Sequence, residues 1–154
     1  MNRELKGTVE ERVEAAIAFA RGSRKPYDHE KISDLYRKVG VPYTEAAEKV
    51  YREWDGVFED IVVYHEDSIH CVDFFIDFFK DPKDFMRWYS VDAEKIVNEQ
   101  TDPIYRTLQR AHSYVYEEIV KEKCAPGTVP IAEGGYYYQG GIYVQPDGKL
   151  MCYH

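Results

Sequence analysis

Cysteine is scarce in this chain, and the few that occur are not spaced like a metal or redox site. Of its 154 residues only Cys71, Cys124 and Cys152 are cysteines, and no two of them form a CxxC motif. An odd number of separated thiols is typical of reduced cysteines, not of a secreted disulfide framework. No apolar run approaches the roughly 18 residues of a membrane span, and the amino terminus MNRELKGTVEERVEA is charged where a signal peptide would be apolar. We therefore expect a soluble, cytoplasmic protein that does not contact a membrane.

Basic residues are also in short supply, with 20 Lys and Arg against 28 Asp and Glu and a formal net charge of −8. Such a balance argues against direct binding of nucleic acid, which requires a basic surface. Residues 53–79, which we call the acidic segment, contain no lysine or arginine. Outside this segment acidic and basic residues are equal in number. Its eight acids are Glu53, Asp55, Glu59, Asp60, Glu66, Asp67, Asp73 and Asp77. The segment is either a solvated face that maintains solubility or a surface for a basic partner.

The usual catalytic motifs are missing. Neither glycine pair, Gly134-Gly135 or Gly140-Gly141, is followed by the Lys-Ser or Lys-Thr of a phosphate-binding loop, and no G-x-G-x-x-G or G-x-S-x-G motif occurs. The second pair leads into the strand-like residues Ile-Tyr-Val. We expect these glycines to relieve crowding within aromatic strands, so that a bulky residue at position 141 should lower stability.

A cluster of potential metal ligands offers one enzymatic alternative. His65, Glu66, His70, Cys71 and Asp73 include every side-chain type that zinc accepts, but their spacing matches no known site. On a hairpin, His65 and His70 could face each other, whereas Cys71 would point to the opposite side from His70. A small metal-assisted hydrolase built around the two histidines therefore remains the alternative to a binding protein. We expect no cofactor and no catalytic residues.

The amino-terminal third of the sequence predicts three helices. The first begins at the capping box Thr8–Glu11 and continues to about residue 21, with an apolar stripe that we expect to pack on the core. The stripe consists of Val9, Val13, Ala16, Ile17 and Ala20. Asp28 caps a second helix, which ends at Gly40, and Thr44 caps a third, for which Gly56 is the expected stop.

The remainder predicts strands interrupted by one helix. Residues 60–79 are rich in β-branched and aromatic side chains and contain a polar break, which favours two strands, although the second could also be helical. A helix is expected from Asp102-Pro103 to about residue 119, and a hairpin with the turn QPDGK closes the chain. The predicted fold is α+β: amino-terminal helices packed on a mainly antiparallel twisted sheet, as a single domain over residues 1–154.

Several of these motifs together resemble the SUKH superfamily of bacterial toxin-immunity proteins, specifically its third branch. The similarity covers about two thirds of the chain, omits residues 81–101 and departs from the family pattern at Ala132, where a glycine is expected. The matching residues are Trp54, Gly56, Pro130-Ile131, Tyr136 to Tyr138, Ile142-Tyr143-Val144 and Asp147-Gly148. The resemblance implies an α+β domain that binds a polymorphic toxin, often a nuclease, one to one and blocks it.

The charge pattern and this resemblance together define an expected partner-binding set. It combines acids of the acidic segment with aromatic residues that could anchor an interface. The set is Glu53, Trp54, Asp55, Glu59, Asp60, Glu66, Asp67, Asp73, Tyr136, Tyr137, Tyr138 and Tyr143. The expected partner is the cognate toxin domain, and the expected state without it is a monomer or weak dimer. A general protein-interaction module with no toxin partner is a further alternative.

Overall fold

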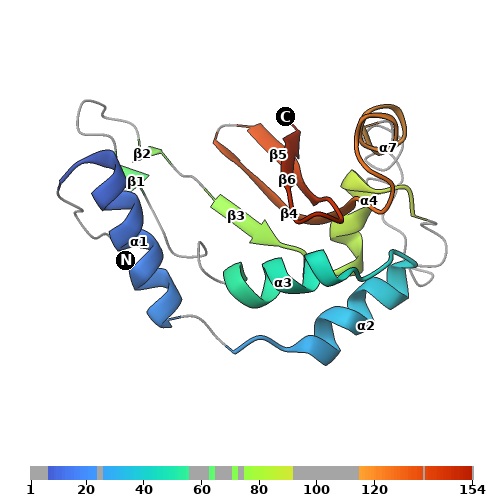
Figure 1. The fold of residues 1–154 in the computed structure, drawn as a ribbon, viewed down its shortest axis with the longest axis horizontal. Coiled ribbons are helices and arrows are strands. Elements are labelled where there is room, and N and C mark those ends of the chain that lie inside the picture. Colours follow the sequence, from blue (N-terminus) through green and yellow to red (C-terminus); the bar gives the residue numbers. More distant parts are fainter. Residues whose placement is uncertain are drawn as a thin grey trace.

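The computed structural model describes residues 7–23, 26–55, 63–64, 71–72, 75–91, 115–136 and 138–153 (Figure 1). Three helices, α1 (Val9–Ser23), α2 (His29–Val39) and α3 (Glu45–Trp54), precede the strands. A four-stranded antiparallel sheet has the order β3-β4-β5-β6, with β3 (Phe75–Phe78), β4 (Val129–Tyr136), β5 (Tyr138–Val144) and β6 (Leu150–Tyr153). The shorter elements are β1 (Val63–Tyr64), β2 (Cys71–Val72), the 3₁₀ turn η1 (Pro82–Asp84), α4 (Phe85–Trp88), the π-helical turn η2 (Val115–Val120) and α7 (Lys121–Lys123). The predicted α+β class with helices before an antiparallel sheet is confirmed.

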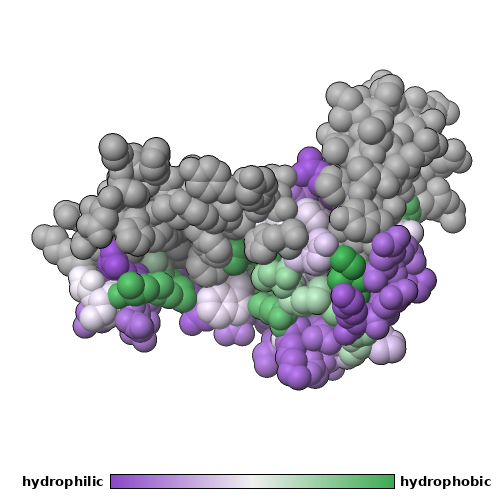
Figure 2. Space-filling view, turned by 90° about the horizontal axis from the view of Figure 1, so that it is seen from above, coloured by the Kyte–Doolittle hydropathy of each residue, from purple (hydrophilic) through white to green (hydrophobic). Residues whose placement is uncertain are grey.

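The first helix begins as predicted but packs only in part as predicted. The Thr8 backbone amide donates to Glu11 Oε2 at 2.8 Å, and the Glu11 amide donates to Thr8 Oγ1 at 3.3 Å, which completes the capping box. The expectation that its apolar stripe lies on the core holds only in part, because Ala16 is 8% exposed whereas Val9 and Val13 are 61% and 49% exposed. Figure 1 shows α1 set apart from the four-stranded sheet, and Figure 2 shows hydrophobic surface at that end of the molecule. An apolar stripe shows only that a helix could pack, not what lies next to it.

Helices α2 and α3 carry the apolar faces that do reach the core. Asp28 and Thr44 cap them through their side chains, which accept from backbone amides three residues later at 3.1 Å in each case. The buried residues of these two helices are Ile32, Leu35, Tyr36, Val39, Ala47 and Tyr51. Gly40 ends α2 in the left-handed region with a φ of 71°, as the sequence predicts. Helix α3 ends with Asp55 as its C-cap, while the predicted stop Gly56 lies outside the described residues.

The middle of the chain forms strands. β1 and β2 pair antiparallel, with Val63 opposite Val72, so the predicted hairpin is confirmed, and its turn lies outside the described residues. The helical alternative for the second half of this region is wrong, because β2 and β3 are both extended. β3 pairs with β4 instead of continuing the first hairpin, which places Asp77 opposite Glu133.

The later elements agree with the sequence where they can be compared. The helix expected to end near residue 119 is described from Val115 and ends at Lys123; its expected start lies outside the described part of the chain. β5 and β6 form the closing hairpin, in which the Gln145 amide donates to the Lys149 carbonyl at 2.9 Å. Gly148 occupies the turn with a φ of 87°, a conformation that favours glycine. No helix among the described residues is both long and apolar enough to cross a membrane.

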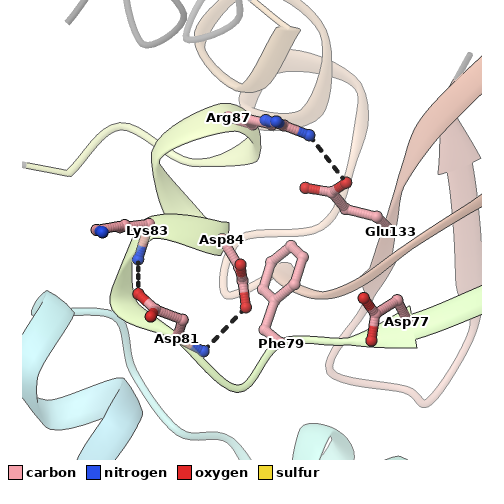
Figure 3. Close-up of a pocket in the computed structure, with 7 residues that line it drawn as sticks. All are labelled: Asp77, Phe79, Asp81, Lys83, Asp84, Arg87 and Glu133. Carbon is pink, nitrogen blue, oxygen red and sulfur yellow. Dashed lines mark hydrogen bonds and ion pairs between the residues drawn. The ribbon is translucent and has the colours of Figure 1, made fainter. Parts of the chain in front are cut away.

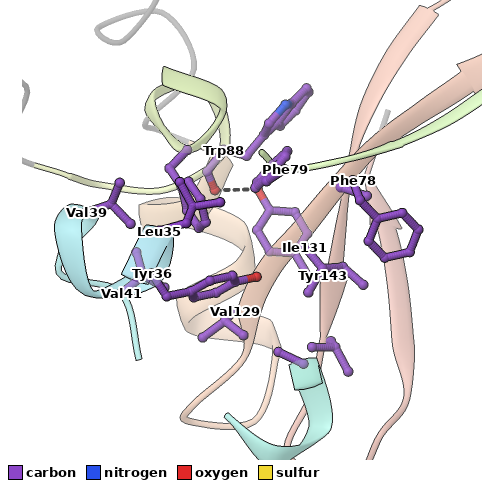
Figure 4. Packing of buried hydrophobic residues seen from close by; sticks show 14 of the residues in the cluster. Leu35, Tyr36, Val39, Val41, Phe78, Phe79, Trp88, Val129, Ile131 and Tyr143 are labelled. Atoms are coloured by element: carbon purple, nitrogen blue, oxygen red, sulfur yellow. Dashed lines mark hydrogen bonds between the residues drawn. The ribbon is translucent and has the colours of Figure 1, made fainter. Parts of the chain in front are cut away.

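Tyrosines connect the helices to the sheet within the core (Figure 4). The Tyr36 hydroxyl donates to the Pro130 carbonyl at 2.7 Å, and the Tyr51 hydroxyl lies 3.0 Å from the Ile131 carbonyl. Both rings are fully buried, and burial raises the pKa of each phenol. Each ring therefore fills core volume while its one polar atom binds a backbone oxygen between helix and strand.

Candidate partner-binding surface

A polar pocket of about 360 Å³ opens where β3 and β4 meet the turn leading into α4 (Figure 3). Four of its lining residues are acidic and two are basic, so the charge of the lining is negative overall. The residues are Asp77, Phe79, Asp81, Lys83, Asp84, Arg87 and Glu133. None of them is a serine, threonine, tyrosine or cysteine, so the lining has no hydroxyl or thiol nucleophile.

Two of the acids face each other across the sheet. Asp77 on β3 is directly opposite Glu133 on β4, and like charges at such positions repel. Glu133 Oε2 lies 3.3 Å from Arg87 Nη1, and the Glu133 side chain is only 13% exposed. Burial raises the pKa of Glu133, while the neighbouring Trp88 side chain and the Arg87 guanidinium partly oppose this rise. The pocket therefore combines a shielded carboxyl at its inner side with the exposed Asp77 at the edge of the sheet.

The other two acids shape the turn before α4. Asp84 Oδ2 accepts hydrogen bonds from the backbone amides of Lys80 and Asp81, each at 2.9 Å. Asp81 Oδ1 accepts from the Lys83 amide at 2.9 Å, which completes a capping box around Pro82. These carboxylates hold η1 in place and also add negative charge beside Asp77 and Glu133. Their electrostatic effect favours a cationic group in the pocket.

Only part of the expected partner-binding set can be located. Glu53 is exposed and lies 3.4 Å from Arg21 of α1, whose guanidinium stacks 4.4 Å from the centre of the Trp54 ring. Asp55 is half-buried at the end of α3. The structure thus brings Glu53, Trp54 and Asp55 together at one helix end. The remaining acids of the set lie outside the described residues: Glu59, Asp60, Glu66, Asp67 and Asp73.

The tyrosines of the set have different outcomes. Tyr136 and Tyr138 pair at the end of the β4–β5 hairpin, and Tyr137 between them lies outside the described residues. Tyr143 was expected to contact the partner, and this expectation is wrong because its side chain is completely buried. Its hydroxyl donates to the Trp88 carbonyl at 2.7 Å, so the ring joins β5 to α4. Tyr143 lies on an inner strand whose face is covered by α4, which explains why it belongs to the core.

Sequence reasoning missed most of the pocket. Asp81-Pro82 has the same cap-and-proline pattern as Asp102-Pro103, whereas Arg87 follows no motif and Glu133 stands alone between Ala132 and the first glycine pair. The available signal was an isolated acid within an otherwise apolar and glycine-rich strand. A carboxyl in such a position requires a partner, which Arg87 supplies here.

Metal binding is not supported by the geometry of the described residues. Within the part of the chain that the structure describes, no three His, Cys, Asp or Glu side chains are grouped as metal ligands would be. The histidines of the alternative hydrolase, His65 and His70, lie outside that part.

The chain was compared with protein-family models, with curated proteins and with solved structures, and no match was found in any of the three.

Proposed function

We propose that the protein is an immunity protein of the SUKH type, which binds a toxin domain one to one in the cytoplasm and blocks it. The observation that carries this proposal is the position of the acidic segment in the fold. Its two described ends, Glu53–Asp55 on α3 and Asp77 on β3, belong to elements that pack together, since the Tyr51 and Phe78 rings lie 5.1 Å apart. The three described acids of the segment, Glu53, Asp55 and Asp77, thus belong to elements that pack on one another.

A basic toxin is the partner that suits this surface. A nuclease must attract the phosphate backbone of its substrate, so its active-site surface carries Lys and Arg. An acidic protein can occupy such a surface, with electrostatic steering to speed association and aromatic anchors to slow dissociation. Trp54, half-buried beneath Arg21 and flanked in sequence by Glu53 and Asp55, suits this anchoring role.

Co-expression with a toxin tests the proposal directly. A toxin domain encoded beside the gene for this chain should stop bacterial growth when expressed alone, and growth should recover when this chain is co-expressed. Titration calorimetry of the purified pair, using a catalytically inactive toxin, should give a stoichiometry of one. Continued growth arrest together with no measurable complex would reject the proposal.

The protein should achieve this without catalysis of its own. After extensive dialysis we expect no stoichiometric zinc in the purified protein. Zinc that is retained by the wild type and lost from a variant with His65→Ala and His70→Ala would instead favour the metal-assisted hydrolase.

A further inference from the structure

The strand β3 forms one edge of the four-stranded sheet, and within the described residues no strand covers its outer side. The Phe79 amide donates to the Ile131 carbonyl at 3.0 Å, which fixes the alternation of hydrogen bonds along this antiparallel pair. By that alternation the backbone of Asp77 faces β4, whereas the backbone groups of Ile76 and Phe78 face outward. Such outward groups can pair with another extended segment.

The two faces of β3 differ in chemistry. Asp77 is exposed on the same face as Glu133 and borders the acidic pocket (Figure 3). Phe78 on the opposite face is 5% exposed, and Ile76 beside it is half-buried. A segment added to this edge would therefore have one row of side chains beside acids and the alternate row beside apolar groups.

We infer that the edge of β3 binds an extended segment of the partner in which Lys or Arg alternates with apolar or β-branched residues. Asp77 and Glu133 are neighbours in one cross-strand row of the sheet. A cation on the added segment, placed opposite Asp77, would continue this row with a charge of opposite sign, which is a favourable cross-strand pair. The pocket beside Asp77 would receive the basic side chain. A second copy of this chain suits the edge less well, because it would set the same acidic strand against itself.

This inference rests on the proposed function for the identity of the partner, but the surface can be tested without a toxin. The probes are the peptide Thr-Lys-Val-Lys-Thr-Lys-Val, with blocked termini, and its twin with glutamate at each lysine. Both have the alternation of a strand, and they differ only in the charge that would lie beside Asp77. Titration into isotope-labelled protein should shift the amide signals of Ile76 and Phe78, with a Kd at least about tenfold lower for the lysine peptide.

Variants show whether the charge at β3 is responsible. Asp77→Lys should reverse the preference between the two peptides, because the row then contains a cation beside the added strand. Glu122→Lys makes the same change of charge on the exposed surface of α7 and should leave the preference as in the wild type. Ile76→Pro removes an outward amide and should weaken both peptides. Each variant is used only after its thermal unfolding has shown that it is folded.

The outcomes separate this inference from the proposed function. If neither peptide shifts Ile76 and Phe78, or both bind equally, Asp77 serves only to protect the edge from pairing, and the inference is overturned. If this protein nevertheless neutralised a toxin, the proposed immunity function would stand, and the toxin would bind at another surface. If the lysine peptide bound with the expected preference but no toxin were neutralised, the edge of β3 would stand as a site for a basic segment and the immunity function would be rejected. Light scattering that revealed a stable dimer through β3 would also overturn the inference.

Discussion

Adding a single methyl group at position 141 should destabilise the protein, because there is no space for it. A Cβ atom on Gly141 would lie 2.7 Å from Cε3 and 2.9 Å from Cδ2 of Trp88, and 2.9 Å from Cε2 of Tyr143. Both side chains are ring systems in the core, with Trp88 5% exposed and Tyr143 fully buried. The Tyr143 hydroxyl is also fixed by its 2.7 Å hydrogen bond to the Trp88 carbonyl. Neither ring can move aside without disturbing the contact between α4 and β5.

The expected size follows from what overpacking costs in other cores. Forcing an extra carbon into a well-packed interior costs about 1–3 kcal/mol in the free energy of unfolding. For a chain of this length each kcal/mol lowers the midpoint of thermal unfolding by about 2–4 °C. Gly141→Ala should therefore lower the midpoint by about 2–12 °C, and Gly141→Val should lower it further because it adds two more methyl groups.

Circular dichroism melts of purified variants measure this effect, and Gly22→Ala supplies the matched control. A Cβ atom at Gly22, in α1, would have no neighbour within 4 Å, and alanine is favoured over glycine within helices. Gly22→Ala should thus melt at or above the wild-type temperature. In a Trp88→Leu background the cost of Gly141→Ala should shrink, since most of the crowding ring is gone. A Gly141→Ala variant that melts like the wild type would refute the packing argument.

Three further results are expected. Tyr143→Phe should lower the free energy of unfolding by about 0.5–3 kcal/mol in urea titrations, because the Trp88 carbonyl loses its 2.7 Å partner. Folding raises the pKa of Glu133 above 4.5, so between pH 4.5 and the folded pKa the folded chain keeps a proton on Glu133 that the unfolded chain has released. The contribution of Glu133 to stability therefore falls as pH rises from about 4.5 through the folded pKa, and Glu133→Gln should flatten this decline in urea titrations at a series of pH values. Reversing four acids to lysine should slow association with the toxin by about tenfold or more at low salt and reduce its salt dependence in stopped-flow measurements. These acids are Glu59, Asp60, Glu66 and Asp67.

Local features of this fold could be predicted because their causes are local. The caps at Thr8, Asp28 and Thr44 and the turn at Gly148 each depend on residues within three or four positions of one another. The glycine at position 141 was also expected to relieve crowding in an aromatic strand, and its contacts with Trp88 agree. At the caps and the turn the composition of a short stretch contains the physical reason for the structure, whereas the closest neighbour of Gly141, Trp88, comes from a distant segment.

The remaining features depend on which distant segments meet. The stripe that begins with Val9 has the spacing of a packed helix, but spacing does not specify a neighbour, and the structure leaves Val9 exposed. Tyr143 is a residue that suits an interface or a core equally well, and only the position of Trp88 on the same face decides between them. The pocket requires β3 to pair with β4 in one register, which no local pattern in either strand indicates.

The pairing of Asp77 with Glu133 also bears on the choice between solubility and recognition as the reason for the acidic segment. Charges that serve only solubility need no particular neighbour and can be spread over the surface. Two acids placed opposite each other on adjacent strands lower stability. Burial of Glu133 adds to this cost, as the rise in its pKa indicates, and Arg87 offsets only part of it. A polar, uncharged residue at either position would keep the edge soluble without the repulsion. The arrangement suits the basic partner segment that we propose for the edge of β3.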